Sequence, residues 1–88
     1  MKRGIKLSID AEEFDKHKSP LKYIVAFLQK NKNRAYTVQA IAKEVGINIQ
    51  EVRSALYWEA IARMLDKTYM SPIETATVGG ITYYKYKG

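Results

Sequence analysis

The chain has 88 residues, a length that suits one domain with a modest core and is too short for two. It contains no cysteine, which excludes a disulfide framework, thiolate catalysis and a thiolate zinc site. No apolar run approaches the ~20 residues of a membrane span, so we expect a cytoplasmic protein with no membrane association.

The formal net charge is +6, and the positive charge is concentrated after the first fifteen residues. Four of the nine acids fall between Asp10 and Asp15, whereas from Lys16 onward twelve Lys or Arg stand against five acids, a net +7. Such an excess attracts phosphate backbones or acidic partners. A solvated lysine-rich surface would have the same charge, so charge alone supports nucleic-acid binding only weakly.

An alternating segment opens the chain. Its apolar residues recur at a period of two, which predicts a short strand with one apolar face. These residues are Ile5, Leu7 and Ile9. Asp10 can then cap a brief helical turn that ends near Phe14, and the charged residues 15–18 are typical of a solvated connector. His17, the single histidine, stands among lysines without companion ligands, so we expect a surface residue and no metal.

The next helix is predicted to begin with Ser19 as its cap and Pro20 at its first position, where no backbone N–H is needed. One face carries apolar residues at helical spacing, and the opposite face, which includes Lys22, is basic and polar. The apolar residues are Leu21, Ile24, Val25, Phe27 and Leu28. A polar run then ends the helix and places Lys32 and Arg34 at the entrance of the next one.

Two short helical patterns meet at Gly46, with too few residues between them for anything but a tight turn. Thr37 can cap the first of these helices, and the glycine can adopt the left-handed conformation that ends it. Asn48 with Glu51 forms a capping-box pattern, so a second helix is predicted from there to about Leu65. The short turn predicts that the two helices cross at a sharp angle.

Four residues around this turn carry a resemblance to a known family: Ala42, Gly46, Ile47 and Val52. A small alanine lets the two helices approach closely, and the two branched residues would close the corner from the inside. The pattern resembles the helix-turn-helix of winged-helix DNA-binding proteins. An ordinary helical hairpin with no nucleic-acid role is the alternative interpretation.

The helix that follows the turn can be divided by angle at ~100° per residue. One arc should face the other helices and contains Ile49, Val52, Ala55 and Leu56. A second apolar arc, roughly opposite, contains Trp58, Ile61, Ala62 and Leu65. Between them lies a polar stripe of Gln50, Arg53 and Tyr57, with Ser54 at its edge. The stripe is near the N-terminal end of the helix, the part that a recognition helix inserts into the major groove.

The chemistry of the stripe suits base recognition. Arg53 can bond bidentately to guanine O6 and N7, and Gln50 can do the same to adenine N6 and N7. The hydroxyls of Ser54 and Tyr57 can reach phosphates or base edges. In the alternative interpretation, Arg53 pairs with a nearby acid and Tyr57 covers the edge of the core. The full set that the resemblance implies for DNA contact is Lys22, Lys32, Arg34, Lys43, Asn48, Gln50, Arg53, Ser54 and Tyr57.

The second apolar arc requires a partner, because Trp58, Ile61 and Leu65 are too large to leave in water together. One interpretation packs them within the chain, beneath the C-terminal hairpin and the N-terminal strand. The other makes them a two-fold dimer contact, since aromatic anchors are common at such interfaces. The sequence leaves both open.

A β-hairpin is predicted from Pro72 onward, because Gly79 and Gly80 separate two β-rich runs. A two-residue turn would pair Val78 with Ile81, Ala76 with Tyr83 and Glu74 with Lys85. The other face would carry Ile73, Thr75, Thr77, Thr82, Tyr84 and Tyr86. A hairpin after a recognition helix is what the resemblance identifies as a wing. The tip lacks the Arg or Lys typical of wings that enter the minor groove.

These patterns predict an α+β fold that is mainly α with a small antiparallel sheet. They divide the chain into an N-terminal extension, residues 1–18, and a three-helix winged helix-turn-helix domain with a C-terminal hairpin wing, residues 19–88. The composition, rich in Lys, Ile and Tyr, also resembles proteins of thermophilic archaea or their viruses and plasmids.

The function that the resemblance implies is sequence-specific binding of double-stranded DNA by a homodimeric transcriptional regulator. Two alternatives stay open: a winged-helix module that binds a protein partner, and a protein that binds single strands or RNA through its seven tyrosines. With one histidine, no cysteine and no spaced carboxylates, we expect no enzyme activity, cofactor or metal site.

Overall fold

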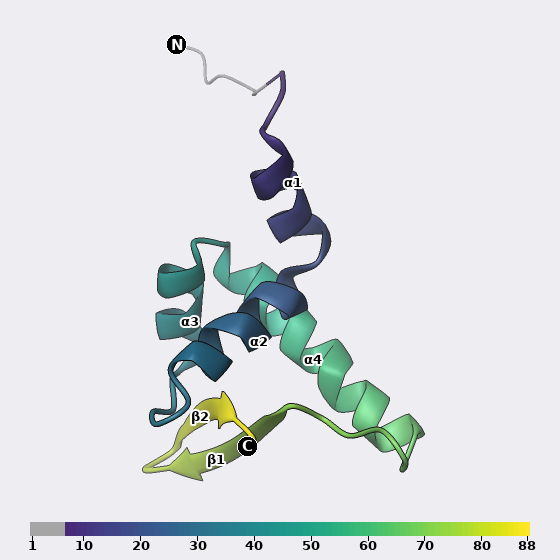
Figure 1. The fold of residues 1–88 in the computed structure, drawn as a ribbon. Coiled ribbons are helices and arrows are strands. Elements are labelled where there is room, and N and C mark those ends of the chain that lie inside the picture. The colour runs from purple at the N-terminus through teal and green to yellow at the C-terminus, as the bar shows by residue number, and fades with distance from the viewer. Residues whose placement is uncertain (1–6) are drawn as a thin grey trace.

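The computed structural model describes residues 7–88, which fold into four helices and one antiparallel hairpin (Figure 1). The elements are α1 (Ala11–Lys18), α2 (Pro20–Lys30), α3 (Val38–Val45), α4 (Ile49–Leu65), β1 (Ile73–Val78) and β2 (Ile81–Tyr86). This confirms the α+β class. Residues 19–88 contain the three expected helices, and the N-terminal extension adds a fourth, α1, where only a brief helical turn was expected.

Helix α1 replaces the predicted short turn and solvated connector. The Asp10 side chain accepts a hydrogen bond from the backbone N–H of Glu13 at 2.8 Å and so caps the helix as expected. The helix then continues to Lys18, because its acids lie in the first turn and its basic residues in the last, the order that the helix dipole favours. The sequence interpretation took these charges only as a mark of solvation.

The predicted N-terminal strand is not found in the part of it that the structure describes. Ile5 lies outside the described residues, and residues 7–9 form no strand, with Leu7 fully exposed. The sheet formed by residues 7–88 is the two-stranded hairpin alone, apart from one isolated bridge. A strand is stable only when its backbone groups find a partner, and residues 7–9 have none in this sheet.

Helices α3 and α4 and the short turn between them form as the local signals predict. The Thr37 side chain accepts from the N–H of Ala40, and Gly46 ends α3 in the left-handed region at φ 81°. At the start of α4, the Asn48 side chain accepts from the N–H of Gln50, and Glu51 completes the capping box. These bonds satisfy the free N–H groups of both helix starts and hold the turn in one conformation.

Helix α2 begins at the predicted place, but not with the predicted cap. Pro20 occupies the first turn and Ser19 the cap position, yet the Ser19 side chain makes no capping hydrogen bond. Instead, the backbone N–H of Ser19 bonds to the carbonyl oxygen of Asp15 at the end of α1. Ser19 therefore closes one helix while it opens the next, which fixes a tight corner between α1 and α2.

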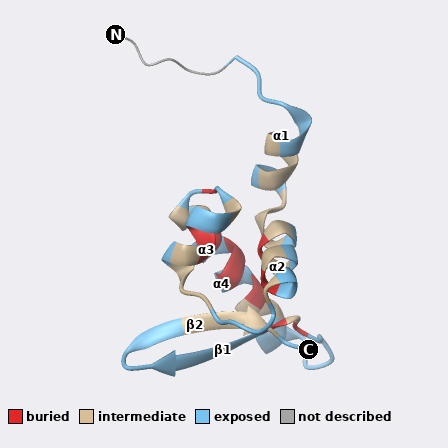
Figure 2. Cartoon of the chain, turned by 60° about the vertical axis from the view of Figure 1, so that its left-hand side comes forward, coloured by how far each residue is buried: buried red, intermediate tan, exposed pale blue. Residues whose placement is uncertain are grey.

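The core lies where α2, α3 and α4 meet above the hairpin, and the buried segments gather there in Figure 2. Its buried apolar residues are Ile24, Leu28, Ile41, Ala42, Ile47, Val52, Ala55, Leu56 and Ile73. Three of the four core residues predicted on α4 are buried, and Ile49 packs at the core edge. Each fully buried branched side chain contributes roughly 1.5–3 kcal/mol to stability, so this cluster holds α4 in place.

The hairpin has the predicted register. Val78 pairs with Ile81, Ala76 with Tyr83 and Glu74 with Lys85, and both turn glycines have positive φ. The opposite face turns inward, with Ile73 buried and Tyr84 and Tyr86 packed against the core.

One isolated bridge joins the hairpin to the segment before α3. Tyr36 and Tyr84 exchange two backbone hydrogen bonds of 2.8 Å. The Tyr36 ring also packs edge-on against that of Phe27 on α2, with the ring centroids 4.8 Å apart. The bridge therefore ties the hairpin to the entrance of α3 and sets the hairpin's position relative to the helices.

Candidate nucleic-acid interface

The predicted polar stripe is exposed along the first two turns of α4. Gln50, Arg53 and Ser54 are all exposed, and Tyr57 is 61% exposed. The opposite side of the same turns is held by Val52, Ala55 and Leu56 in the core. The stripe thus stands on a helix whose orientation is set by buried contacts rather than by solvent-exposed side chains.

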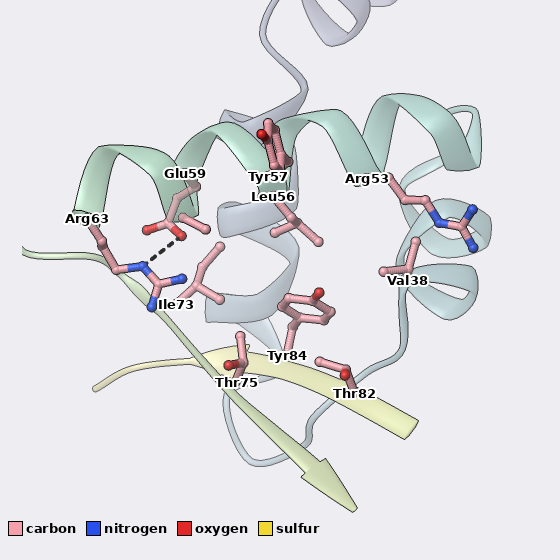
Figure 3. A pocket seen from close by; sticks show the side chains of 11 residues that line it. Val38, Arg53, Leu56, Tyr57, Glu59, Arg63, Ile73, Thr75, Thr82 and Tyr84 are labelled. Atoms are coloured by element: carbon pink, nitrogen blue, oxygen red, sulfur yellow. Dashed lines mark ion pairs between the residues drawn. The ribbon is translucent and has the colours of Figure 1, made fainter. Parts of the chain in front are cut away.

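The two sides of the stripe border different surfaces. Arg53 and Tyr57 line a cleft of about 460 Å³ between α4 and the hairpin (Figure 3). Gln50 and Ser54 line an open hollow, on the other side of α4, that the corner between α1 and α2 and the Trp58 side chain also line. The exposed end of α4 therefore projects between two flanking elements.

The cleft between α4 and the hairpin carries the groups that bind anions. Two guanidinium groups come from α4, those of Arg53 and Arg63, which lie more than two helical turns apart. Three hydroxyl groups come from the strands, those of Thr75, Thr82 and Tyr84. Guanidinium groups bond phosphate oxygens in a fork, and hydroxyls add single hydrogen bonds. The Arg63 guanidinium already has one partner, because its Nε lies 3.3 Å from Glu59 Oε1.

Glu59 forms the inner wall of this cleft. Its side chain is only 1% exposed, and its carboxylate accepts hydrogen bonds from the hydroxyl of Ser71 and pairs with Arg63. Ser71 Oγ in turn accepts a hydrogen bond from the backbone N–H of Ile73 at 3.1 Å. The network thus fastens the start of β1 to the middle of α4.

The sequence interpretation missed Glu59, Ser71 and Arg63. A signal was present for the first of them, because Glu59 stands seven residues after Val52 and so falls in the core arc of α4. A carboxylate at a helix position that faces the core predicts a buried polar partner. Nothing local predicts that the partner is Ser71, which lies in the connection between α4 and β1.

In the alternative interpretation, Arg53 would pair with an acid and Tyr57 would cover the core, and neither role is observed. Arg53 forms no salt bridge within residues 7–88. The Tyr57 ring is edge-on to that of Trp58, with centroids 5.7 Å apart, and does not cover the core. Both side chains are therefore available to a ligand at the surface.

The predicted phosphate-contacting residues fall into separate places. Lys22 lines the hollow beside Gln50, but its Nζ lies 3.2 Å from Asp15 Oδ2. Lys43 is exposed on α3, and Asn48 is exposed at the turn while it caps α4. Lys32 and Arg34 are exposed in the loop from α2 to α3, which lies beside the hairpin and away from the turn at Gly46 (Figures 1 and 2).

The carboxylates near the stripe are engaged by hydrogen bonds. The His17 side chain, followed by the backbone N–H of Asn48, lowers the pKa of Glu51. The hydroxyl of Tyr23 and the ammonium of Lys22 lower the pKa of Asp15. Both groups are therefore ionised at neutral pH, and the ammonium of Lys22 offsets the charge of Asp15.

The second apolar arc of α4 is only partly covered by residues 7–88. Trp58 is 64% exposed and Leu65 81% exposed, while Ile61 and Ala62 are half-buried. Met64 is exposed beside them. Trp58 and Leu65 therefore do not pack beneath the hairpin. The hairpin packs on a different face of α4, the one that carries Leu56 and Glu59.

The described residues contain no group of three His, Cys, Asp or Glu side chains that could hold a metal ion. Among these residues, no helix has the length and apolar character needed to cross a membrane. No protein-family model, curated protein or solved structure matches this chain.

Proposed function

We propose that this protein binds double-stranded DNA as a winged helix-turn-helix transcriptional regulator, with α4 inserted in the major groove. The single observation that carries the proposal is the exposed stripe of Gln50, Arg53 and Tyr57 on a capped helix that begins at a tight turn. A helix with its side chains is about 10–12 Å wide and the major groove is about 12 Å wide, so the N-terminal end of α4 can enter it.

The roles within the stripe follow from its chemistry. Arg53, which has no salt bridge within residues 7–88, would read guanine, and Gln50 would read adenine. Lys43 and Lys22 lie on elements on either side of α4 and would contact phosphates. The cleft toward the hairpin would receive one DNA backbone, with Arg63 and Thr82 as donors. Lys32 and Arg34, beside the hairpin, would reach that same strand only further along the duplex.

We further propose that two copies associate through the second apolar arc of α4, which contains Trp58, Ile61, Ala62 and Leu65, together with the exposed Met64. Large exposed apolar side chains that adjoin one another mark interfaces in soluble proteins. A two-fold dimer would present two α4 helices about one DNA turn apart, ~34 Å, and would favour a palindromic site.

A fluorescently labelled duplex library tests DNA binding. We expect selection of a preferred site at low salt and a steep loss of affinity as salt rises. Arg53→Ala should weaken binding to the preferred site by about 1–3 kcal/mol and relax the preference at one base pair. Lys67→Ala, which removes one positive charge beyond the end of α4, is the matched control and should leave the preference unchanged.

A second candidate function is a protein-interaction module, and the exposure of Trp58 and Leu65 favours it. The two functions separate in one comparison. Absence of duplex binding at low salt, together with a stable complex with another protein that Trp58→Ser abolishes, would replace DNA binding with this alternative.

A further inference from the structure

The last turn of α1 is fastened to the N-terminal end of α4. His17 Nδ1 lies 2.7 Å from one carboxylate oxygen of Glu51 and 3.0 Å from the other. A Cβ placed on Gly46 would lie 3.6 Å from Lys16 Nζ, so α1 also reaches the turn between α3 and α4. One hydrogen-bonded contact and one close approach from α1 thus meet the helix-turn-helix at the point from which the polar stripe begins.

The same turn of α1 is fastened to α2. Asp15 accepts a hydrogen bond from the hydroxyl of Tyr23 at 2.7 Å and from Lys22 Nζ at 3.2 Å. The backbone bond from Ser19 to Asp15 closes the corner. The end of α1 is therefore positioned by α2 and α4 together, although sequence patterns predicted a solvated connector here.

This arrangement places a lysine next to the polar stripe. Lys18 is exposed and lines the hollow that Gln50 and Ser54 also line. It makes no salt bridge within residues 7–88, and its electrostatic effect on Asp15 is the weakest of those that lower the pKa of that carboxyl. The carboxylate that lines the hollow, Glu51, is engaged by His17 and by the N–H of Asn48.

We propose that the last turn of α1 belongs to the DNA-binding surface, with Lys18 in contact with a backbone phosphate at the edge of the groove that receives α4. The inference rests on the proposed function. A duplex that receives Gln50 in its major groove carries a phosphate backbone along each side of that groove. The hairpin cleft flanks one side of α4, and Lys18 flanks the other, so α4 would be held between two backbone contacts.

A salt titration of duplex binding tests this inference. For Lys18→Ala, we expect roughly three- to tenfold weaker binding at low salt and a plot of log affinity against log salt whose slope is shallower by about 1. The preference among duplex sequences should not change, because a phosphate carries no sequence information. Lys67→Ala loses the same charge and should differ from the parent protein by less than about twofold.

A second variant separates the contact from its support. His17→Ala keeps Lys18 but removes the bond to Glu51, so we expect a smaller loss than that of Lys18→Ala, with the same sequence preference. Circular dichroism and thermal unfolding of both variants verify that the helix-turn-helix remains folded. Lys18→Gln retains most of the side-chain stem. If it loses as much affinity for the duplex as Lys18→Ala does, the charge of Lys18 is responsible.

The outcomes distinguish the two proposals. If the parent protein binds no duplex, the proposed function is wrong and the contact of α1 fails with it. If Arg53→Ala weakens binding while Lys18→Ala leaves affinity and salt slope unchanged, DNA binding stands and the inference about α1 is wrong. Tighter binding by Lys18→Ala would also overturn it, since α1 would then obstruct the duplex.

Discussion

The two halves of α4 expose surfaces of opposite chemistry along one continuous helix. The N-terminal half presents Gln50, Arg53 and Ser54 to solvent, and the C-terminal half presents Trp58, Met64 and Leu65. The buried face continues through both halves from Val52 to Glu59. A single helix can therefore carry two adjoining surfaces of different chemistry, provided that a buried face holds it, here from Val52 to Glu59.

The supports of the two halves also differ. The N-terminal half is held by caps, by the turn at Gly46 and by the contact of His17 with Glu51. The C-terminal half is held by the buried bonds of Glu59 to Ser71 and Arg63. Variants in each half should therefore have separable effects on base recognition, association and stability.

The largest effect on stability is expected at Glu59. Glu59→Ala leaves the Ser71 hydroxyl without its acceptor and opens a small cavity beside Ile73, so the free energy of unfolding should fall by about 2–3 kcal/mol. Glu59→Gln preserves an acceptor for Ser71 and should lose less. Urea unfolding monitored by Trp58 fluorescence measures both. Equal losses in the two variants would show that the carboxylate charge, rather than the hydrogen bond, matters.

Trp58 tests the apolar surface. Trp58→Ser should weaken self-association by about 2 kcal/mol, roughly 30-fold, because buried aromatic anchors dominate such interfaces. Light scattering over a concentration series measures the mass. Base preference, measured on a single half-site, should remain that of the parent protein. Arg53→Ala should change the base preference and leave self-association as it is in the parent protein. A variant that changes both base preference and self-association would argue against two separate surfaces.

A smaller effect is expected at the cap of α4. Asn48→Ala removes the acceptor for the N–H of Gln50 and should lower the free energy of unfolding by about 1 kcal/mol. Asn48→Ser, which can cap in the same way, is the matched control. If the alanine variant also loses more affinity for DNA than the serine variant, the cap positions the stripe as well as stabilising the helix.

The smallest effect is a dependence of stability on pH. The pKa of Glu51 is lower in the folded protein than its ordinary value of 4.5, chiefly because His17 bonds its carboxylate. The unfolded chain therefore takes up this proton more readily, so the stabilisation is complete above about pH 4.5 and is lost as pH falls through the folded pKa. Asp15, whose pKa is also lowered, adds to the same trend.

Unfolding measured between pH 3 and pH 6 isolates the part due to Glu51. Glu51→Gln keeps the capping-box geometry but cannot titrate, so its stability should fall less steeply with acid than that of the parent protein. An identical decline in both proteins would assign the acid sensitivity to other carboxylates.

Sequence by itself determined the features that depend on neighbouring residues. Thr37, Gly46, Asn48 and the glycine pair of the hairpin set two caps, one turn and one strand register, because each acts through bonds within a few residues. The same local reasoning divided α4 into its buried and exposed arcs. The DNA-binding roles of the stripe stay predictions.

Only the tertiary structure decided the features that depend on contacts between distant segments. The docking of α1 on α4 through His17, the burial of Glu59 against Ser71 and the exposure of Trp58 each join or separate residues from different elements. The helical period predicts which residues share a face of a helix, but not whether another segment of the chain covers that face. That depends on the packing of the other helices and the hairpin.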